Sequence, residues 1–168
     1  MKQPKEWECS NCGAPAIVAR GKYKFTGSGL KNVLLIGVEL VKCKKCGNVD
    51  PIIPDMKGLM QCLALAVLEK PWKLSGDEIR YLRKYLRMTA QEFGGYIGVD
   101  KTTVSKWEND RDQVGESSDK LIRAITLTKG DGLRGSMEDV IRQFPNIGKA
   151  LKACQYTYDT ETQQVEYA

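Results

Sequence analysis

The segment "MTAQEFGGYIGVDKTTVSKWEND", residues 88–110, decides the fold of the middle of the chain. It opens with a capping box, in which Thr89 is followed three residues later by Glu92 at the start of a helical apolar pattern. Gly98 ends that helix, and after a turn of three residues Asp100 can cap another. The segment therefore predicts a helix, a tight turn and a second helix.

The second helix has one apolar face and one polar face when it is wound at about 100° per residue. Val104 and Trp107 lie on the apolar face, and Gly94 lies where the two helices must cross closely, so we expect only Gly or Ala there. The polar face consists of Thr102, Ser105, Lys106 and Asn109, with Lys101 and Thr103 at its margins. Such a face is either ordinary solvated surface or a helix face suited to a DNA groove.

Two further helices flank this pair. Residues 74–88, "LSGDEIRYLRKYLRM", begin with a second capping box formed by Ser75 and Glu78. Residues 114–127, "VGESSDKLIRAITL", form another helix. Its expected core face consists of Leu121, Ile122 and Ile125. Together these elements predict a helix-turn-helix arrangement in which the second helix of the pair reads DNA.

Four cysteines form two C-x2-C pairs separated by thirty residues: Cys9, Cys12, Cys43 and Cys46. Two such pairs complete a tetrahedral four-thiolate site with no open position, so we expect one structural Zn²⁺ per chain. Chance spacing is one alternative, and a redox dithiol, which would need only one pair, is the other. The intervening residues 16–25 and 32–43 are rich in β-branched and aromatic side chains and predict a β-hairpin. Residues 1–54 are thus expected to form a zinc-binding β domain.

Composition limits the function further. The chain of 168 residues has 26 basic and 21 acidic residues, a net charge of +5. Eleven basic and six acidic residues fall in residues 1–70. This excess is weak evidence for nucleic-acid binding. The absence of histidine excludes a Ser-His-Asp triad and any histidine metal ligand. No enzyme motif is present, so we do not expect an enzyme.

The rest of the chain predicts linking and additional elements. The longest apolar run, residues 59–68, is too short to span a bilayer, and the first residues lack a signal-peptide core, so we expect a cytoplasmic protein without a membrane partner. The run belongs to a hydrophobic helix over 55–71 that leads into a helical domain over 72–130. The extension 131–168 has the pattern of a short helix and a β-hairpin, which either covers its own chain or pairs with another.

Residues 75–127 resemble the XRE family of helix-turn-helix domains, which has the lambda-repressor-like fold. The resemblance rests on "MTAQEFGGYIGVDKTTVSKWEND" and "VGESSDKLIRAI". It implies base contacts from Thr102 and Lys106, and backbone contacts near Thr89 and Gln91. Many family members have Gln directly after the capping Thr, whereas this chain has Ala90 there and Gln91 one position later.

With the cysteine pairs and the basic hairpin included, residues 5–127 resemble the MqsA-type (YgiT-type zinc finger) antitoxin family. This resemblance implies that the zinc domain binds a small toxin protein. It also implies that the helix-turn-helix domain forms a homodimer on a palindromic operator in double-stranded DNA and represses its own operon.

The sequence therefore predicts an α+β protein, with a small β-rich four-cysteine zinc domain followed by an all-α DNA-binding domain. The expected function is that of a transcriptional repressor that is also an antitoxin. One alternative is a stand-alone regulator without a toxin. The other is an interaction adaptor that does not read DNA, although an adaptor has no need of the exposed face on residues 101–109.

Overall fold

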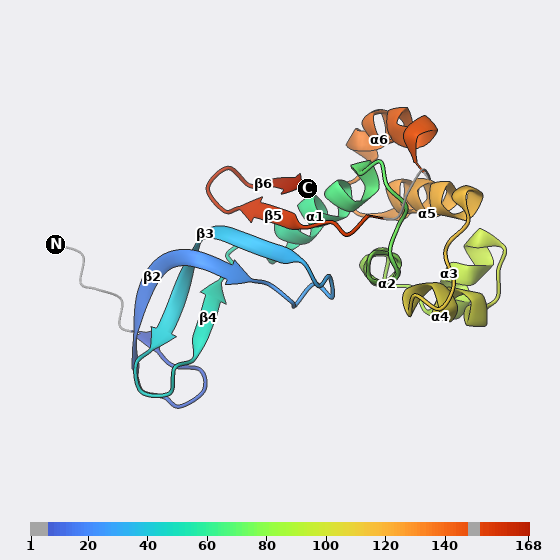
Figure 1. Ribbon diagram of the computed structural model, residues 1–168. Helices are drawn as coiled ribbons and strands as arrows, with labels where there is room; N and C mark the ends of the chain where they lie inside the picture. The colour runs from blue at the N-terminus through green and yellow to red at the C-terminus, as the bar shows by residue number, and fades with distance from the viewer. Residues whose placement is uncertain (1–6, 148–151) are drawn as a thin grey trace.

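The computed structural model describes residues 7–147 and 152–168. Within these ranges the chain forms a six-stranded sheet and six α-helices (Figure 1). The sheet lies at one end of an elongated molecule, and most helices lie at the other. The predicted order of a β-rich part followed by a helical part is thus confirmed. No helix in the described ranges is long and apolar enough to cross a membrane.

The first four strands of the sheet include the predicted hairpin. They are β1 (Trp7–Glu8), β2 (Pro15–Lys24), β3 (Val33–Cys43) and β4 (Val49–Ile52). β2 and β3 pair in antiparallel fashion from Ala16 opposite Cys43 to Lys24 opposite Leu34. β4 pairs with β3 near its C-terminal end, and this pairing returns the chain beside the cysteine pairs.

The end of the chain completes the same sheet. β5 (Tyr156–Asp159) and β6 (Gln164–Tyr167) form the antiparallel hairpin that the tail predicts. β5 pairs in parallel with the first part of β3, where Val33 lies opposite Tyr156. The strand order is β1-β2-β3-β5-β6, with β4 also paired to β3. The sequence leaves open whether the hairpin covers its own chain or pairs with another. In the structure the hairpin pairs with β3 of its own chain.

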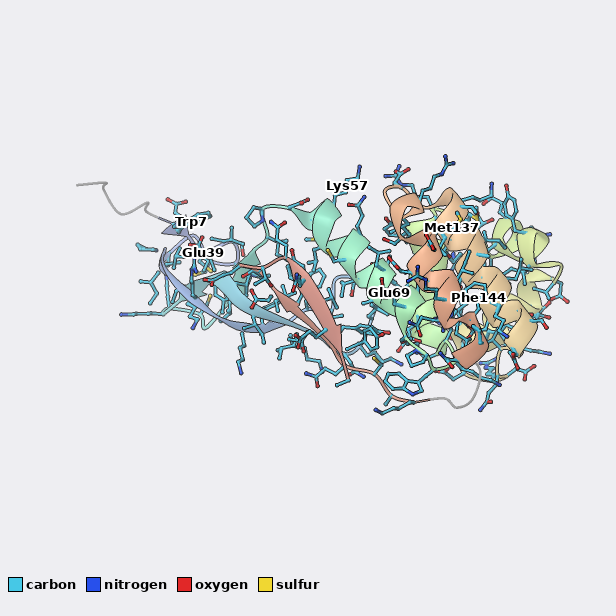
Figure 2. All side chains as sticks on the ribbon, turned by 90° about the horizontal axis from the view of Figure 1, so that it is seen from above. Trp7, Glu39, Lys57, Glu69, Met137 and Phe144 are labelled. Atoms are coloured by element: carbon cyan, nitrogen blue, oxygen red, sulfur yellow. The ribbon has the colours of Figure 1, made fainter. Side chains whose placement is uncertain are left out.

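The helices are α1 (Met56–Glu69), α2 (Gly76–Tyr85), α3 (Ala90–Ile97), α4 (Lys101–Glu108), α5 (Glu116–Lys129) and α6 (Met137–Gln143). α1 contains the apolar run and ends at Glu69, just inside the range 55–71 that the sequence predicts. Seen from above, it extends from Lys57 beside the sheet to Glu69 among the other helices (Figure 2). It contacts β5 and β6 as well as α2 and α6, so its apolar surface is covered on several sides.

The core is continuous from the sheet through α1 to the other helices. Its fully buried members include Leu35 of β3, Leu63 of α1 and Phe93 of α3. One core prediction is wrong, because Leu121 of α5 is 40% exposed. The inward face of α5 instead includes a buried ion pair, which a pattern of apolar residues does not reveal.

Candidate functional site

The four cysteines meet at the end of the sheet that holds β1 and β4. Their Sγ atoms all lie within 4.8 Å of one another. The Sγ atoms of Cys9 and Cys46 are 3.5 Å apart, and those of Cys12 and Cys43 are 3.6 Å apart. Tetrahedral zinc with Zn–S bonds of about 2.3 Å separates its sulfurs by roughly 3.8 Å. The cluster is therefore compatible with a single tetrahedral metal ion.

Each cysteine pair is formed by the same backbone turn. The carbonyl of Cys9 accepts the N–H of Gly13 at 2.9 Å, and that of Cys43 accepts the N–H of Gly47 at 3.0 Å. The two glycines have φ of 68° and 75°, in the left-handed region that glycine adopts without steric cost. The glycine after each pair is thus required by the turn that brings both thiols to one point.

The local environment divides the protons of the cluster unequally. The backbone N–H of Asn48 and the thiol of Cys9 lower the pKa of Cys46 to about 6. The N–H of Ala14 acts to lower the pKa of Cys12, but the neighbouring thiols outweigh it and raise this pKa to about 12. A divalent cation bound by the four cysteines would displace the protons of the thiols.

A polar cluster behind the cysteines joins the two turns. Asp50 Oδ2 of β4 accepts hydrogen bonds from the hydroxyl of Ser10 at 2.5 Å and from the amide of Asn48 at 2.7 Å. Ser10 belongs to the first cysteine turn, and the other two residues follow the second. The sequence analysis missed this cluster, although polar residues beside metal ligands are a recognisable signal for groups that orient a site.

The second candidate site is α3, the turn after it and α4. The predicted caps are present: Thr89 N donates to Glu92 Oε2 at 2.8 Å, and Thr103 N donates to Asp100 Oδ1 at 2.8 Å. Gly98 has φ of 82° and ends α3. The expected helix, three-residue turn and helix are thus confirmed as local structure.

Gly94 packs closely against the turn after α3 as well as against α4. A Cβ atom built there would lie 2.5 Å from the backbone carbonyl oxygen of Val99 and 3.4 Å from a side-chain carbon of Val104. The prediction that either Gly or Ala fits is therefore wrong. Only glycine fits without a shift of backbone, because a carbonyl oxygen cannot rotate away as a flexible side chain can.

α4 separates its residues as the helical pattern predicts. Val104 is fully buried, and Trp107 is 6% exposed. The residues predicted to bind DNA lie outward along the helix: Lys101, Thr102, Ser105 and Lys106 are exposed, and Thr103 is half-buried. The exposed side chains share one side of a helix whose opposite side is fixed in the core, so they can meet a partner without unfolding the protein.

Asn109 differs from the others. It lies one residue beyond α4, where its side-chain amide donates to the Ser105 carbonyl at 2.7 Å and its oxygen accepts from Arg80 at 3.0 Å. Asn109 therefore contributes to the end of the helix. Thr89 and Gln91 are exposed at the start of α3, and the Thr89 hydroxyl belongs to the capping box.

α2 fixes the end of α4. Arg83 of α2 donates to both oxygens of Glu108, with distances of 2.6 Å from Nε and 3.0 Å from Nη2. This pairing raises the pKa of Arg83. Arg80 donates to the Glu108 carbonyl at 2.7 Å. A bidentate pair restricts orientation as well as distance, so the position of α4 depends on the position of α2.

Comparison of the chain with protein-family models, with curated proteins and with solved structures found no match.

Proposed function

We propose that the chain is a sequence-specific DNA-binding protein that represses transcription, with α4 as its recognition helix. The observation that carries this proposal is the exposed face of α4, where Thr102, Ser105 and Lys106 project beside Lys101 from a helix anchored by Val104. Hydroxyl and ammonium groups on one helical face match the hydrogen-bonding edges of bases and the phosphates of a major groove. The arrangement of α2 to α5 supports the XRE-type helix-turn-helix assignment.

The cysteine cluster holds one structural Zn²⁺ in this proposal. Cys9, Cys12, Cys43 and Cys46 supply a complete shell of four thiolates, which leaves no position for a substrate or a reactive water. The ion ties β1 and the β3–β4 connection together at the end of the sheet that is farthest from the helices. Its contribution is stability rather than chemistry.

The zinc-binding sheet is also the proposed docking surface for a small toxin, which would make the protein an antitoxin and autorepressor. Within the described residues β1 covers only Pro15 and Ala16, so the remainder of β2 has a neighbouring strand on one side alone. Ile17 is 50% exposed and Val18 38% exposed on that strand. An uncovered strand edge with exposed apolar side chains can accept a strand of a partner.

A single recognition helix covers only half of a palindromic site, so the proposal includes a homodimer on double-stranded DNA. Two-fold symmetry would place the half-sites about one helical turn, roughly 34 Å, apart. Footprinting on a selected operator measures this spacing. Protection of one unrepeated half-site by a monomer would contradict the dimer.

The test of DNA recognition starts with selection of an operator from random duplexes and continues with titration of variants at two salt concentrations. Lys106→Ala removes an exposed charge on α4, and Lys57→Ala removes an exposed charge on α1 beside the sheet as a matched control. If Lys106 contacts a base edge, its loss costs about 1–3 kcal/mol and relaxes preference at one base pair. If it contacts phosphate, binding weakens equally on all sequences and the salt slope falls by about one.

The alternative functions predict different results. Binding of operator at wild-type strength by both Lys106→Ala and Thr102→Ala would show that α4 is not the recognition helix, and would favour an interaction adaptor. Co-expression of the full chain with the product of a neighbouring reading frame, followed by pull-down, tests the toxin partner. Specific DNA binding without any such partner would favour a stand-alone regulator.

A further inference from the structure

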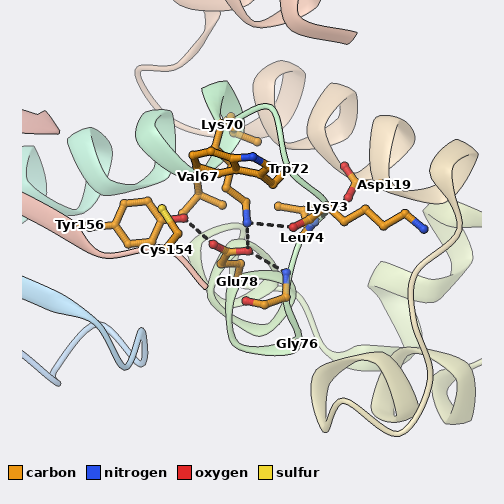
Figure 3. Close-up of polar contacts among 12 residues, drawn as sticks. Val67, Lys70, Trp72, Lys73, Leu74, Gly76, Glu78, Asp119, Cys154 and Tyr156 are labelled. Carbon is orange, nitrogen blue, oxygen red and sulfur yellow. Dashed lines mark hydrogen bonds and ion pairs between the residues drawn. The ribbon is translucent and has the colours of Figure 1, made fainter. Parts of the chain in front are cut away.

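Three buried polar side chains join the sheet to the helices. Lys70 follows α1, Glu78 lies in the first turn of α2, and Tyr156 begins β5 (Figure 3). All three are at most 3% exposed. The ammonium of Lys70 is 2.6 Å from Glu78 Oε2, and the hydroxyl of Tyr156 donates to Glu78 Oε1. The C-terminal hairpin is thus bonded to the helix that supports α4.

Glu78 has a second role that makes this contact specific. Its Oε2 also accepts the backbone N–H of Ser75 at 2.7 Å, which is the capping-box bond that starts α2. A buried carboxylate is costly unless donors surround it, and here both of its oxygens have donors. The Tyr156 hydroxyl therefore fixes the side chain that determines where α2 begins.

A neighbouring buried pair holds the segment between α1 and α2. Arg123 of α5 bonds to Asp119 at 2.7 Å and donates to the carbonyls of Leu68 at 2.6 Å and Trp72 at 2.7 Å. Asp119 in turn accepts the N–H of Leu74 at 2.7 Å. The segment between α1 and α2 is therefore hydrogen-bonded along its length. As a result, the start of α2 cannot move without breaking some of these bonds.

The contacts continue from α2 to α4. Gly76 N donates to Asp110 Oδ1 at 2.9 Å, two residues after α4 ends, and Arg83 holds Glu108. On the other side, β5 is paired with β3, the strand that ends at Cys43. We propose that Tyr156 is a positioning residue through which the metal-bearing sheet fixes α4. The part of this inference that concerns DNA rests on the proposed function.

The test compares Tyr156→Phe with Tyr158→Phe in the full chain with its metal. Both tyrosines are buried on the same face of β5, but the Tyr158 hydroxyl makes no hydrogen bond within the described ranges. Each change removes one hydroxyl and keeps the ring. Tyr156→Phe should speed hydrogen exchange in the amides of α4 without DNA, and should weaken operator binding about fivefold, at the low end of typical coupling between sites. Tyr158→Phe should change neither.

Binding to a random duplex separates positioning from a loss of folded protein. A smaller folded fraction would lower operator and random-duplex binding by the same factor, whereas a displaced α4 lowers the operator affinity alone, because phosphate contacts tolerate small shifts. The inference would be overturned if Tyr156→Phe and Tyr158→Phe had equal effects on hydrogen exchange in α4 and on the ratio of operator affinity to random-duplex affinity.

Two further results keep the inference distinct from the proposed function. If wild type binds no duplex specifically but Tyr156→Phe alone speeds exchange in α4, the proposed function fails and the positioning role stands. If Tyr156→Phe does not fold, native-state exchange of wild type in dilute denaturant replaces it. β5, the start of α2 and α4 should then open as one cooperative unit, and opening of α4 while β5 and α2 stay protected would overturn the inference.

Discussion

Replacement of Gly94 by alanine gives a direct test of the close packing between α3 and the turn that follows it. Alanine is favoured over glycine in a helix by about 1 kcal/mol, so helix propensity alone predicts stabilisation. The added Cβ, however, would lie 2.5 Å from the carbonyl oxygen of Val99, and the turn between α3 and α4 would have to shift. Overpacking of this kind costs typically about 1–3 kcal/mol, so we expect a net change from near zero to about 2 kcal/mol of destabilisation.

Gly95 is the matched control. It is the next residue of α3, it is exposed, and a Cβ built there meets no atom within 4 Å. Gly95→Ala should therefore gain the helix propensity without a clash, and stabilise the protein by up to about 1 kcal/mol. The two variants have the same composition, so their difference isolates the close packing at Gly94. That difference should be about 1–3 kcal/mol in favour of Gly95→Ala.

Urea unfolding and thermal melts of both variants measure the difference. For a chain of this size each kcal/mol corresponds to a shift of about 2–4 °C in Tm. Equal stability of Gly94→Ala and Gly95→Ala would refute the close contact between Gly94 and the turn that follows α3.

Three other predictions concern the metal, acid stability and the buried ion pair. Metal analysis should return about one zinc per chain. Chelation of the metal should expose the amides of the sheet to exchange before those of α5. A folded protein with free thiols and no metal would contradict this prediction. Hydrogen bonds from Thr102 and from the backbone N–H of Thr103 lower the pKa of Asp100. The contribution of the Asp100 carboxylate to folding stability is therefore present above its unfolded pKa of about 4, and is lost as pH falls through its folded pKa. In urea titrations Asp100→Asn should lower stability at about pH 7 but not at about pH 2. Arg123→Met should lower the free energy of unfolding by about 3–5 kcal/mol, because it leaves the buried Asp119 without its cationic partner. Lys120→Met removes a more exposed ion pair of the same helix, and should lower the free energy of unfolding by no more than about 1 kcal/mol in the same titrations.

Features set by neighbouring residues could be predicted from the sequence. The capping boxes, the end of α3 at Gly98 and the two cysteine turns each depend on residues within about four positions. The same holds for the outward face of α4, because helical geometry alone places Lys106 opposite Val104. The proximity of the two cysteine pairs was also predictable, because two C-x2-C pairs with this spacing are typical of a shared metal site.

Features set by distant contacts could not be predicted. Lys70, Asp119 and Arg123 belong to the residue types that are seldom buried, and nothing local to them distinguishes an inward position. Parallel pairing of β5 with β3 joins residues more than a hundred positions apart, and alternation in a short strand does not specify its neighbour. The error at Leu121 has the same origin, because Asp119 and Arg123 are buried on α5 together with Ile122 and Ile125, whereas Leu121 is exposed.

Glu78 shows how one residue can be partly predictable. Its bond to the Ser75 backbone is local, and the spacing of the capping box predicts it. Tyr156 reaches the same buried carboxylate from the far end of the chain, and Lys70 reaches it from the end of α1. A capping glutamate at a solvent-exposed helix start can be replaced at small cost. Here the loss of the carboxylate would leave the buried ammonium of Lys70 without its counter-charge, with only the Lys73 carbonyl as a partner, and would remove the acceptor of the Tyr156 hydroxyl. The importance of Glu78 therefore depends on the pairing of the C-terminal hairpin with the sheet, which local sequence patterns do not predict.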